Sequence, residues 1–248
     1  MLAGMSPRLL ALLLPLLALP ALAQQVVMVK ISAGTGFFIS HQGDLITNAH
    51  VVKNCQSISV KTADGERGAT LVAADAGRDL ALLRVSGGAD SIANLRWNIR
   101  DVKPGDEVVV MGFPGQEGVG GRYQFKKSTV LGLNGPTGEP QWIQLESVAE
   151  HGNSGGPVLD AAGNVIGVIT GNAFTYRTLT SNGQPVAEPS LVGKSDIAIT
   201  LPVLEGFLND NHVYYSESSS GLVTHADDRL QEVASAFIVP VRCYLGPR

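Results

Sequence analysis

The feature that most constrains the fold of this chain is a regular succession of short, β-rich segments separated by turn residues. Such runs, bounded by Gly, Asp and Asn and free of helical periodicity, are typical of strands. They form two series. The first comprises residues 26–31, 36–40, 45–47, 57–62, 69–74 and 80–85, and the second comprises 107–111, 123–131, 142–147, 156–159, 165–170 and 196–200. This spacing predicts an all-β fold, either a sandwich or a barrel.

Helices and long loops are sparse in the sequence. Residues 202–211 begin with a proline and carry apolar residues at helical spacing, and residues 227–236 are a second helix candidate. We interpret the stretch 98–104 as the joint between the two strand series. Loops are expected at the glycine-rich stretch 114–121 and at the polar stretch 178–194, whose length is typical of a functional or disordered loop.

The first 23 residues have the layout of a secretory signal peptide. Arg8 supplies the positive charge, an apolar run at 9–19 follows, and Ala21-Leu22-Ala23 places small residues at the cleavage site. The apolar run is too short to favour a membrane span, so an uncleaved anchor is the weaker alternative. We therefore predict that the mature chain begins at Gln24, has no stable membrane anchor, and is periplasmic or secreted.

Charge, cysteine content and motif spacing limit the partners, disulfides and cofactors that the chain can be expected to have. The net charge is −4 and the sequence has no basic block, which argues against a nucleic-acid partner. The two cysteines, Cys55 and Cys243, permit one disulfide in an exported protein, and two free buried thiols are the alternative. The sequence has no metal-ligand spacing, and Gly34-Thr35-Gly36 lacks the third glycine of a dinucleotide site. We therefore expect neither a metal nor a cofactor.

The most informative motif is a glycine-rich turn, Gly152-Asn153-Ser154-Gly155-Gly156-Pro157, which precedes an apolar run. Glycines let the backbone turn tightly and aim its N–H groups at one point. A serine hydroxyl is a weak nucleophile at neutral pH unless a base and an oxyanion site lie beside it. Ser154 is therefore a candidate nucleophile, and the motif predicts a histidine and a carboxylate elsewhere in the chain.

Two residues have the context that such partners need. Of the five histidines, His50 lies where a strand-like run ends and a tight turn begins. His151 immediately precedes the serine turn, so we expect it at the rim of the pocket instead. Asp79 is a polar residue at the start of an apolar strand, where it could hold an imidazole. A local turn bond is its alternative role, and Asp75 is a rival carboxylate.

Together these contexts resemble the trypsin-like serine proteases. The chain order His50, Asp79, Ser154 matches that family and differs from the orders of subtilisins and α/β-hydrolases. The closest branch is that of the bacterial Htr/Deg-type proteases, and the resemblance spans about residues 26–212. The segments that carry it are Gly34-Thr35-Gly36-Phe37 and residues 46–52, 79–85, 105–114, 152–157 and 163–170.

The resemblance implies a double barrel. The fold class would be all-β, with two six-stranded antiparallel β-barrels followed by a short C-terminal helix and a tail. The active site would lie in the crevice between the barrels. The expected divisions are a signal peptide at 1–23, a protease domain at 24–212 with barrel one at about 26–100 and barrel two at about 105–200, and a C-terminal tail at 213–248.

The resemblance also implies a role for each residue of the site. Ser154 would be the nucleophile, and His50 would be the general base and then the acid to the leaving amine. Asp79 would orient the imidazole without becoming protonated itself. The backbone N–H groups of Gly152 and Ser154 would form the oxyanion hole.

Substrate contacts follow from the same resemblance. In this family the residue six positions before the serine lines the base of the specificity pocket, and that residue is Val148, with Ala149 next to it. Neither is acidic, so we predict a preference for small to medium apolar residues. His151 would contact the substrate from the rim, and a substrate strand would pair with the edge near Thr170.

The tail departs from the Htr/Deg pattern. Those proteins usually carry a peptide-binding PDZ domain after the protease domain, and residues 213–248 are too few for one. Regulation through such a domain is therefore not transferred to this chain. We hypothesise that the tail packs on the protease domain, returns to barrel one, and bridges Cys243 to Cys55, which would close a long loop and add stability.

The sequence thus predicts an exported serine endopeptidase that acts on proteins or peptides through an acyl-enzyme intermediate. The first alternative is a latent or inactive protease-fold binding module, because the sequence does not show which way the peptide at Gly152 points. The second is an acyl transferase or esterase that uses the same triad. The sequence carries no signal for a particular oligomeric state.

Overall fold

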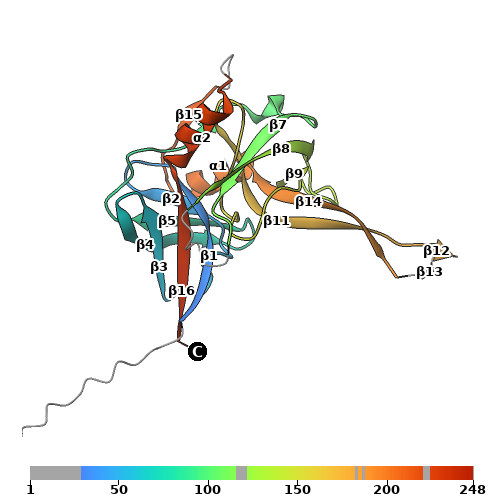
Figure 1. Cartoon of the computed structure of the whole chain (residues 1–248), viewed down its shortest axis with the longest axis horizontal. Helices are drawn as coiled ribbons and strands as arrows, with labels where there is room; N and C mark the ends of the chain where they lie inside the picture. Colours follow the sequence, from blue (N-terminus) through green and yellow to red (C-terminus); the bar gives the residue numbers. More distant parts are fainter. Residues whose placement is uncertain (1–28, 116–121, 182–183, 186–187, 220–223, 248) are drawn as a thin grey trace, which may run out of the picture.

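A computed structural model describes residues 29–115, 122–181, 184–185, 188–219 and 224–247 of the chain (Figure 1). The expected signal peptide at 1–23 lies outside these residues, as does most of the glycine-rich loop expected at 114–121.

The first barrel is a closed sheet of six antiparallel strands that run in the order β1-β16-β3-β4-β5-β2. Five of its strands come from the first part of the chain, and the sixth, β16, comes from the C-terminal end (Figure 1). Full closure leaves no unpaired sheet edge. The strands are β1 (Val29–Phe38), β2 (Asp44–Thr47), β3 (Ser57–Thr62), β4 (Gly65–Asp75), β5 (Leu80–Val85) and β16 (Ile238–Pro247).

The first barrel differs from the expected strand series in two places. Residues 29–38 form one strand, where the sequence predicted two, 26–31 and 36–40, with a break that includes Gly34. Gly34 and Gly36 do not interrupt the strand; they admit close neighbours, because a Cβ atom on Gly36 would lie 2.4 Å from the side chain of Leu45. The sixth strand is supplied by the tail, so the tail is an integral part of the barrel.

The second barrel is formed by β7, β8, β9, β14, β11 and β10, which pair in that order and close through β10 and β11. Two further short strands, β6 (Asn94–Arg96) and β15 (Ser216–Ser218), extend the sheet in parallel beside β11. The all-β double barrel is therefore confirmed. The barrel strands are β7 (Glu107–Gly112), β8 (Gln124–Gly132), β9 (Trp142–Glu146), β10 (Pro157–Leu159), β11 (Val165–Arg177) and β14 (Ser190–Thr200).

Two α-helices lie close to where the sequence predicts them, α1 (Leu201–Asp210) and α2 (Asp227–Ser235), and a short 3₁₀ helix spans Ile99–Asp101. Pro202 lies in the first turn of α1, where the fixed φ of proline matches the helical backbone. Among the helices that the structure describes, none has the length and apolarity to cross a membrane.

Three apolar cores hold the fold together, one inside each barrel and one between them. Strand β5 feeds two of these cores, because successive side chains of a strand point to opposite faces. Ala81 and Leu83 pack inside the first barrel, whereas Leu80 and Leu82 pack between the barrels. The residues just before and after such a strand are thereby fixed at the crevice between the barrels.

The tail is joined covalently to the first barrel. Cys55 lies just before β3, Cys243 lies in β16, and the two form a disulfide across a sequence separation of 188 residues. This is the pairing expected from the sequence. In the paired register Cys243 lies opposite Ile58 of β3, so the disulfide links neighbouring parts of one sheet.

Strands β11 and β14 continue beyond the second barrel as a long two-stranded arm (Figure 1). The stretch 178–194, which was expected to be a loop, contains the first residues of β14 and two short strands, β12 (Thr180–Ser181) and β13 (Gln184–Pro185). Its polar composition does not exclude strand pairing, because both faces of the arm are open to solvent.

Candidate active site

His50 and Asp79 lie together at the crevice end of the first barrel. The carboxylate Oδ2 of Asp79 is 2.8 Å from Nδ1 of His50, and its Oδ1 accepts the backbone N–H of His50 at 3.0 Å. The aspartate side chain is 27% exposed and the histidine side chain 47%. The imidazole is therefore fixed at one nitrogen, and its other nitrogen is left for a second partner.

The backbone at Asp79 has a φ of +54°, in the left-handed region that aspartate tolerates better than most residues. This conformation directs the chain into β5, and it is stabilised by the residues that immediately precede His50. The carbonyl of Asp79 accepts the side-chain amide of Asn48 at 2.9 Å and the N–H of Ala49 at 3.2 Å. The two segments that carry the acid and the base are thus tied together through the backbone.

Asp79 is held in its charged form. Burial alone would raise the pKa of its carboxyl, but hydrogen bonds from His50 and Thr170 and the charge on His50 outweigh burial and lower the pKa overall. The hydroxyl of Thr170 donates to the same oxygen that faces His50. A carboxylate with two donors on one oxygen is suited to orient an imidazole while remaining ionised.

Ser154 reaches this pair through Thr170. Its Oγ lies 3.5 Å from the carbonyl oxygen of Thr170, whose hydroxyl bonds Asp79. Thr170 therefore lies between the two parts of the site: its side chain contacts Asp79, and its backbone carbonyl faces Ser154. Within the described residues the serine hydroxyl makes no hydrogen bond to the imidazole of His50, so the structure brings three expected residues to one place without joining that last pair.

The turn around Ser154 depends on glycine. Gly152 has a φ of +99°, and a Cβ atom there would lie 2.3 Å from the carbonyl oxygen of Phe113. The carbonyl of His151 accepts the N–H of Gly115 at 2.8 Å. In the part of the chain that the structure describes, neither the N–H of Gly152 nor that of Ser154 donates a hydrogen bond.

Thr35 clamps the same turn from the first barrel. Its hydroxyl donates to the carbonyl of Gly152 at 2.7 Å and accepts the N–H of Phe113 at 2.9 Å. Its backbone N–H donates to the carbonyl of Ser154 at 2.8 Å. Since Thr35 is fully buried, both carbonyls of the turn are fixed by one residue that water does not reach.

Val148 and Ala149, the expected pocket residues, are held by a buried carboxylate. Asp196 of β14 is fully buried and accepts the N–H of Val148 at 2.7 Å and that of Ala149 at 2.6 Å. Its other oxygen accepts from the Ser147 hydroxyl at 3.2 Å and from the Asn172 amide at 2.6 Å. Four donors thus bond this carboxylate. Three of them come from residues 147–149, so Asp196 fixes the position of the segment that precedes the turn.

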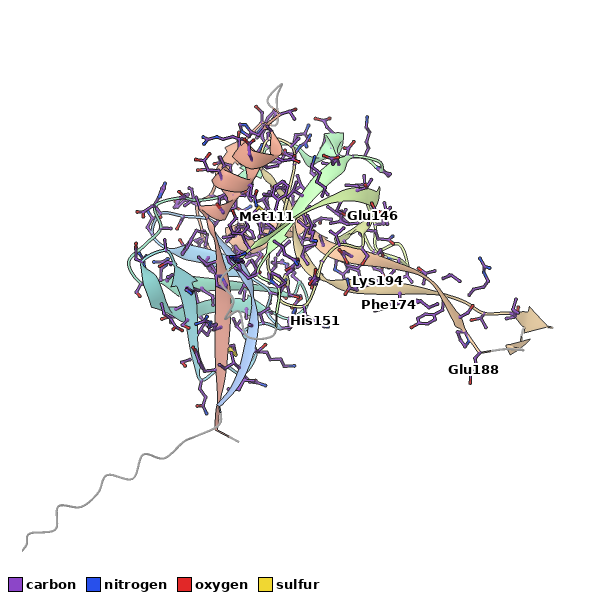
Figure 2. The ribbon with its side chains drawn as sticks, viewed as in Figure 1. Met111, Glu146, His151, Phe174, Glu188 and Lys194 are labelled. Atoms are coloured by element: carbon purple, nitrogen blue, oxygen red, sulfur yellow. A yellow bond between two sulfur atoms is a disulfide. The ribbon has the colours of Figure 1, made fainter. Side chains whose placement is uncertain are left out.

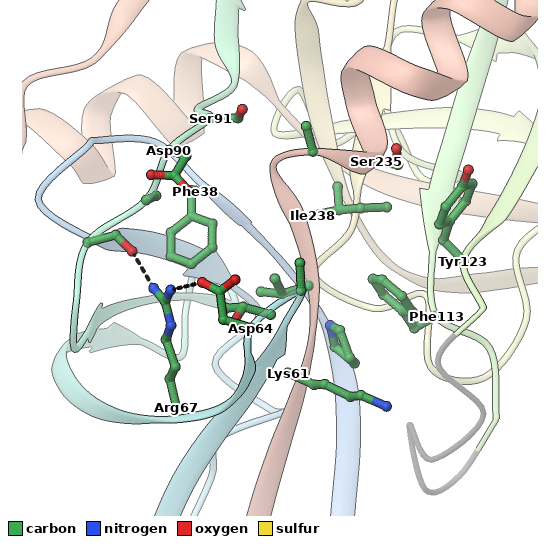
Figure 3. A pocket seen from close by; sticks show the side chains of 17 residues that line it. Phe38, Lys61, Asp64, Arg67, Asp90, Ser91, Phe113, Tyr123, Ser235 and Ile238 are labelled. Atoms are coloured by element: carbon green, nitrogen blue, oxygen red, sulfur yellow. Dashed lines mark hydrogen bonds and ion pairs between the residues drawn. The ribbon is translucent and has the colours of Figure 1, made fainter.

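A separate cavity of about 420 Å³ lies beside the site (Figure 3). Figure 3 shows Phe38, Lys61 and Arg67 on one side and Phe113 and Tyr123 on the other, with the guanidinium of Arg67 already bonded to Asp64 and Gly88. None of the residues that line it belongs to the expected triad. Within the described residues there is no cluster of three or more side chains suited to hold a metal ion.

The family model of the trypsin-like peptidase domain matches residues 34–168, which include the expected triad. The chain belongs to the trypsin-like peptidase family. This stretch contains both segments of the first barrel that carry His50 and Asp79 and the turn of the second barrel that carries Ser154.

Individual proteins support the same family. The chain is 36% identical over 213 residues to the uncharacterized protein y4bJ of Sinorhizobium fredii, covering 86% of this chain and 32% of that protein. It is 30% identical over 208 residues to a probable periplasmic serine endoprotease, DegP-like, of Bartonella henselae, covering 78% and 41%. The chain spans 29% to 45% of the length of its curated relatives.

A solved structure also resembles the whole double barrel. The active form of the Rv3671c protease from M. tuberculosis is 27% identical, with a TM-score of 0.56, and the match covers 76% of this chain and 78% of that chain. The similarity to the Htr/Deg branch and to this protease agrees with the resemblance inferred from the motifs.

Two residues of the site carry no clear signal in the sequence, Thr35 and Asp196. Thr35 lies in Gly34-Thr35-Gly36-Phe37, one of the segments that carry the family resemblance, but nothing in that segment assigns a role to the threonine itself. Asp196 precedes a buried apolar run at 197–199, and an acidic residue next to such a run is typical of a strand end. Their roles depend on contacts between the barrels or between strands, which local patterns do not reveal.

Proposed function

We propose that this chain is a serine endopeptidase that hydrolyses peptide bonds with Ser154, His50 and Asp79. The observation that carries the proposal is that one residue, Thr170, bonds Asp79 through its hydroxyl and lies 3.5 Å from Ser154 Oγ through its carbonyl oxygen, while Asp79 bonds His50. These residues come from both barrels and meet at the crevice between them. Family membership supports a protease chemistry for the same residues.

The chemistry would proceed in two halves. Ser154 Oγ attacks the carbonyl carbon of the scissile bond while its proton passes to Nε2 of His50, and the tetrahedral intermediate then collapses. The C–N bond breaks, the leaving amine takes the proton from His50, and an acyl-enzyme ester remains on Ser154. Water repeats the sequence: it gives a proton to His50, attacks the ester and releases the acid, and Ser154 Oγ recovers the proton.

The resting hydroxyl must first leave the carbonyl of Thr170. Catalytic hydrogen bonds are often long or misaligned without substrate and tighten when substrate binds. Rotation about the Cα–Cβ bond of Ser154 is enough to change the partner of its Oγ. The absence of a Ser154–His50 bond among the described residues therefore does not weigh against the triad.

The oxyanion hole would be formed by the N–H groups of Gly152 and Ser154. The N–H of Gly115 holds the carbonyl of His151, and a trans peptide points the N–H of Gly152 in the opposite direction. The carbonyl of Asn153, which shares its peptide with the N–H of Ser154, accepts the N–H of Gly156 at 2.8 Å, so the planes of both donor peptides are set before substrate arrives. Within the described residues neither N–H has a partner, and two such donors beside one nucleophile favour an active turn over the latent binding module.

Specificity would favour small to medium apolar residues before the scissile bond. Val148 and Ala149 are both apolar and only partly exposed. Asp196 lies next to them but already accepts four hydrogen bonds, so it offers no free oxygen to a lysine or arginine of the substrate. His151 is exposed at the rim and remains a proposed substrate contact.

The protein would act outside the cytoplasm. The layout of residues 1–23 as a signal peptide, the disulfide, and the periplasmic location in the name of the DegP-like relative all support a periplasmic or secreted enzyme. The domain limits at 24–212 and 213–248 also remain a proposal. The position of β16 inside the first barrel favours treating both ranges as one protease unit.

The decisive experiment is labelling of the mature protein with a fluorophosphonate probe, beside a Ser154→Ala control. Labelling of the wild type alone, together with cleavage of a peptide library at apolar residues, is the expected result. A wild type that neither labels nor cleaves, although it is folded, would establish the latent binding module instead. Dominant cleavage after basic residues would refute the proposed specificity.

A further inference from the structure

The arm exposes an unusual amount of apolar surface. It consists of residues 174–177 of β11 and 190–194 of β14, which pair with each other beyond the part of β14 that pairs with β9 (Figure 2). Figure 2 shows Phe174 and Lys194 on the arm, away from the barrel core. Phe174 is 53% exposed, Tyr176 56% and Leu191 55%. A two-stranded ribbon alone is marginally stable in water, so apolar groups on it favour a partner.

One edge of β11 is open along the whole arm. The edge that faces away from β14 pairs with β10 up to Val168, and the backbone of Ile169 bonds Gly155 and Gly156 at 2.8 and 2.9 Å. From Thr170 to Arg177 no strand of the described chain pairs with this edge. Unpaired N–H and C=O groups along a strand edge are a template for another extended chain.

The open edge begins at the nucleophile. The carbonyl of Thr170 lies 3.5 Å from Ser154 Oγ, and β11 runs away from Ser154 as it continues into the arm. A chain added antiparallel to β11 would therefore approach Ser154 along the arm. The part lying on the arm would precede the scissile bond. From Thr170 to Arg177 the strand spans about 23 Å at 3.3 Å per residue.

We propose that the arm is a docking platform for the substrate segment that precedes the scissile bond. This inference rests on the proposed protease function and extends the pairing expected near Thr170 to about seven residues. The segment binds as an extended strand on the open edge of β11, and its apolar side chains pack on Phe174 and Tyr176. The preferred substrate therefore presents about seven extended residues on the N-terminal side of the cleaved bond, with apolar side chains that face Phe174 and Tyr176.

Peptide length provides the first test. A quenched fluorescent peptide with two residues before the scissile bond is compared with peptides extended on that side to four, six and eight apolar-rich residues. We expect kcat/KM to rise with each extension up to about seven residues, by at least tenfold in total. The control extends the same core after the scissile bond, where no such gain is expected. A flat series, or equal gains on both sides, would overturn the proposal.

Backbone pairing provides the second test. An antiparallel strand bonds a neighbouring edge with every second residue. N-methylation of the long peptide at successive positions should therefore lower kcat/KM at alternate residues, by fivefold or more, and leave the residues between them little affected. A uniform effect, or none, would show that the segment does not pair with the edge.

Variants separate this platform from an interface between copies of the chain. In the Phe174→Ser/Tyr176→Ser double variant, we expect the kcat/KM ratio of the long to the short peptide to fall from at least ten to near one. Leu131→Ser, which removes a residue 52% exposed on β8, should keep the wild-type ratio. An unchanged ratio in the double variant, together with loss of a dimer in sedimentation, would assign the arm to self-association.

A binding measurement keeps this inference distinct from the proposed function. The Ser154→Ala variant cannot turn over, so the dissociation constants of labelled long and short peptides can be measured by fluorescence anisotropy. We expect the long peptide to bind at least tenfold more tightly. Tight, length-dependent binding with no cleavage by the wild type would refute the protease and keep the platform. Cleavage with no length dependence would refute the platform alone.

Discussion

Thr35 gives the sharpest test of how the two barrels share one active site. The Thr35→Val substitution keeps the shape of the side chain and removes its hydroxyl. Two hydrogen bonds are lost, to the carbonyl of Gly152 and from the N–H of Phe113. Thr35 is fully buried and Phe113 is 8% exposed, so the groups left behind gain little from water. The variant therefore removes the contact that fixes the Gly152–Asn153 peptide, which lies between the peptides that carry the two proposed oxyanion donors.

The magnitude follows from the two orphaned groups. A buried donor or acceptor without a partner costs about 1–3 kcal/mol. The costs of two such neighbouring groups do not add in full, because the surrounding structure relaxes around both of them. We expect the free energy of unfolding to fall by about 2–4 kcal/mol. One oxyanion donor accounts for about 10²–10³ in kcat, so a turn that loses its support should lose between about tenfold and that limit. KM should change less, because the contacts of Thr170 are untouched.

The assay combines urea unfolding with steady-state cleavage of one peptide. Thr35→Ser keeps the hydroxyl and should restore most of kcat. The matched control is Ser40→Ala, between β1 and β2, which removes a buried bond to the carboxylate of Asp44 at 2.6 Å and another from the N–H of Asp44 at 3.3 Å. It should cost about 1–3 kcal/mol and leave kcat unchanged. If Thr35→Val unfolds like the wild type and keeps its kcat within twofold, the clamp has no role.

Three further predictions concern other parts of the chain. Asp79→Asn should lower kcat by about 10⁴-fold and reduce the loss of stability at acid pH. The folded pKa of Asp79 lies below its unfolded value of about 3.9, so the stabilisation is present above that value and is lost as the pH falls through the folded pKa. Urea unfolding of both proteins between pH 6 and 2 measures this difference. Asp196→Asn should leave two buried donors unpaired, cost roughly 2–4 kcal/mol in urea unfolding, and broaden the residues accepted before the scissile bond in a peptide library. The double substitution Cys55→Ala/Cys243→Ala should lower stability by up to about 5 kcal/mol, according to the chain-entropy model for so long a loop, and an unchanged melting temperature would contradict it.

Features with a local signal could be predicted from the sequence. Residues 80–83 of β5 are a continuous apolar run because both faces of the strand are buried there, and α1 has a proline in its first turn and apolar residues at helical spacing. The turn at Ser154 is marked by glycines that its geometry requires, since Gly152 and Gly155 both have positive φ. Candidate residues for the site could be found for the same reason: each lies at a strand end or a turn.

Features that depend on distant pairing could not be predicted. Cys243 leads to the expectation that the tail returns to barrel one, but nothing in residues 238–247 shows that they form a strand between β1 and β3, because an apolar strand pairs equally well with many neighbours. The arm was misread as a loop, since a ribbon open on both faces lacks the alternation that marks a half-buried strand. Thr35 and Asp196 act on residues more than forty positions away, so no spacing within a motif encodes their roles.

The position of β16 connects these distant elements to the chemistry. In the paired register Thr35 lies opposite Pro240, and Ser32 lies opposite Cys243, which the disulfide ties to the start of β3. The strand that clamps the Gly152–Ser154 turn is therefore itself held in place by the last strand of the chain. A strand is held rigidly only when the strands on both sides of it are present, and an edge strand frays more readily than an enclosed one. The geometry around Ser154 consequently depends on residues that lie more than eighty positions beyond it, so the C-terminal segment belongs to the active fold as much as the segment that carries His50.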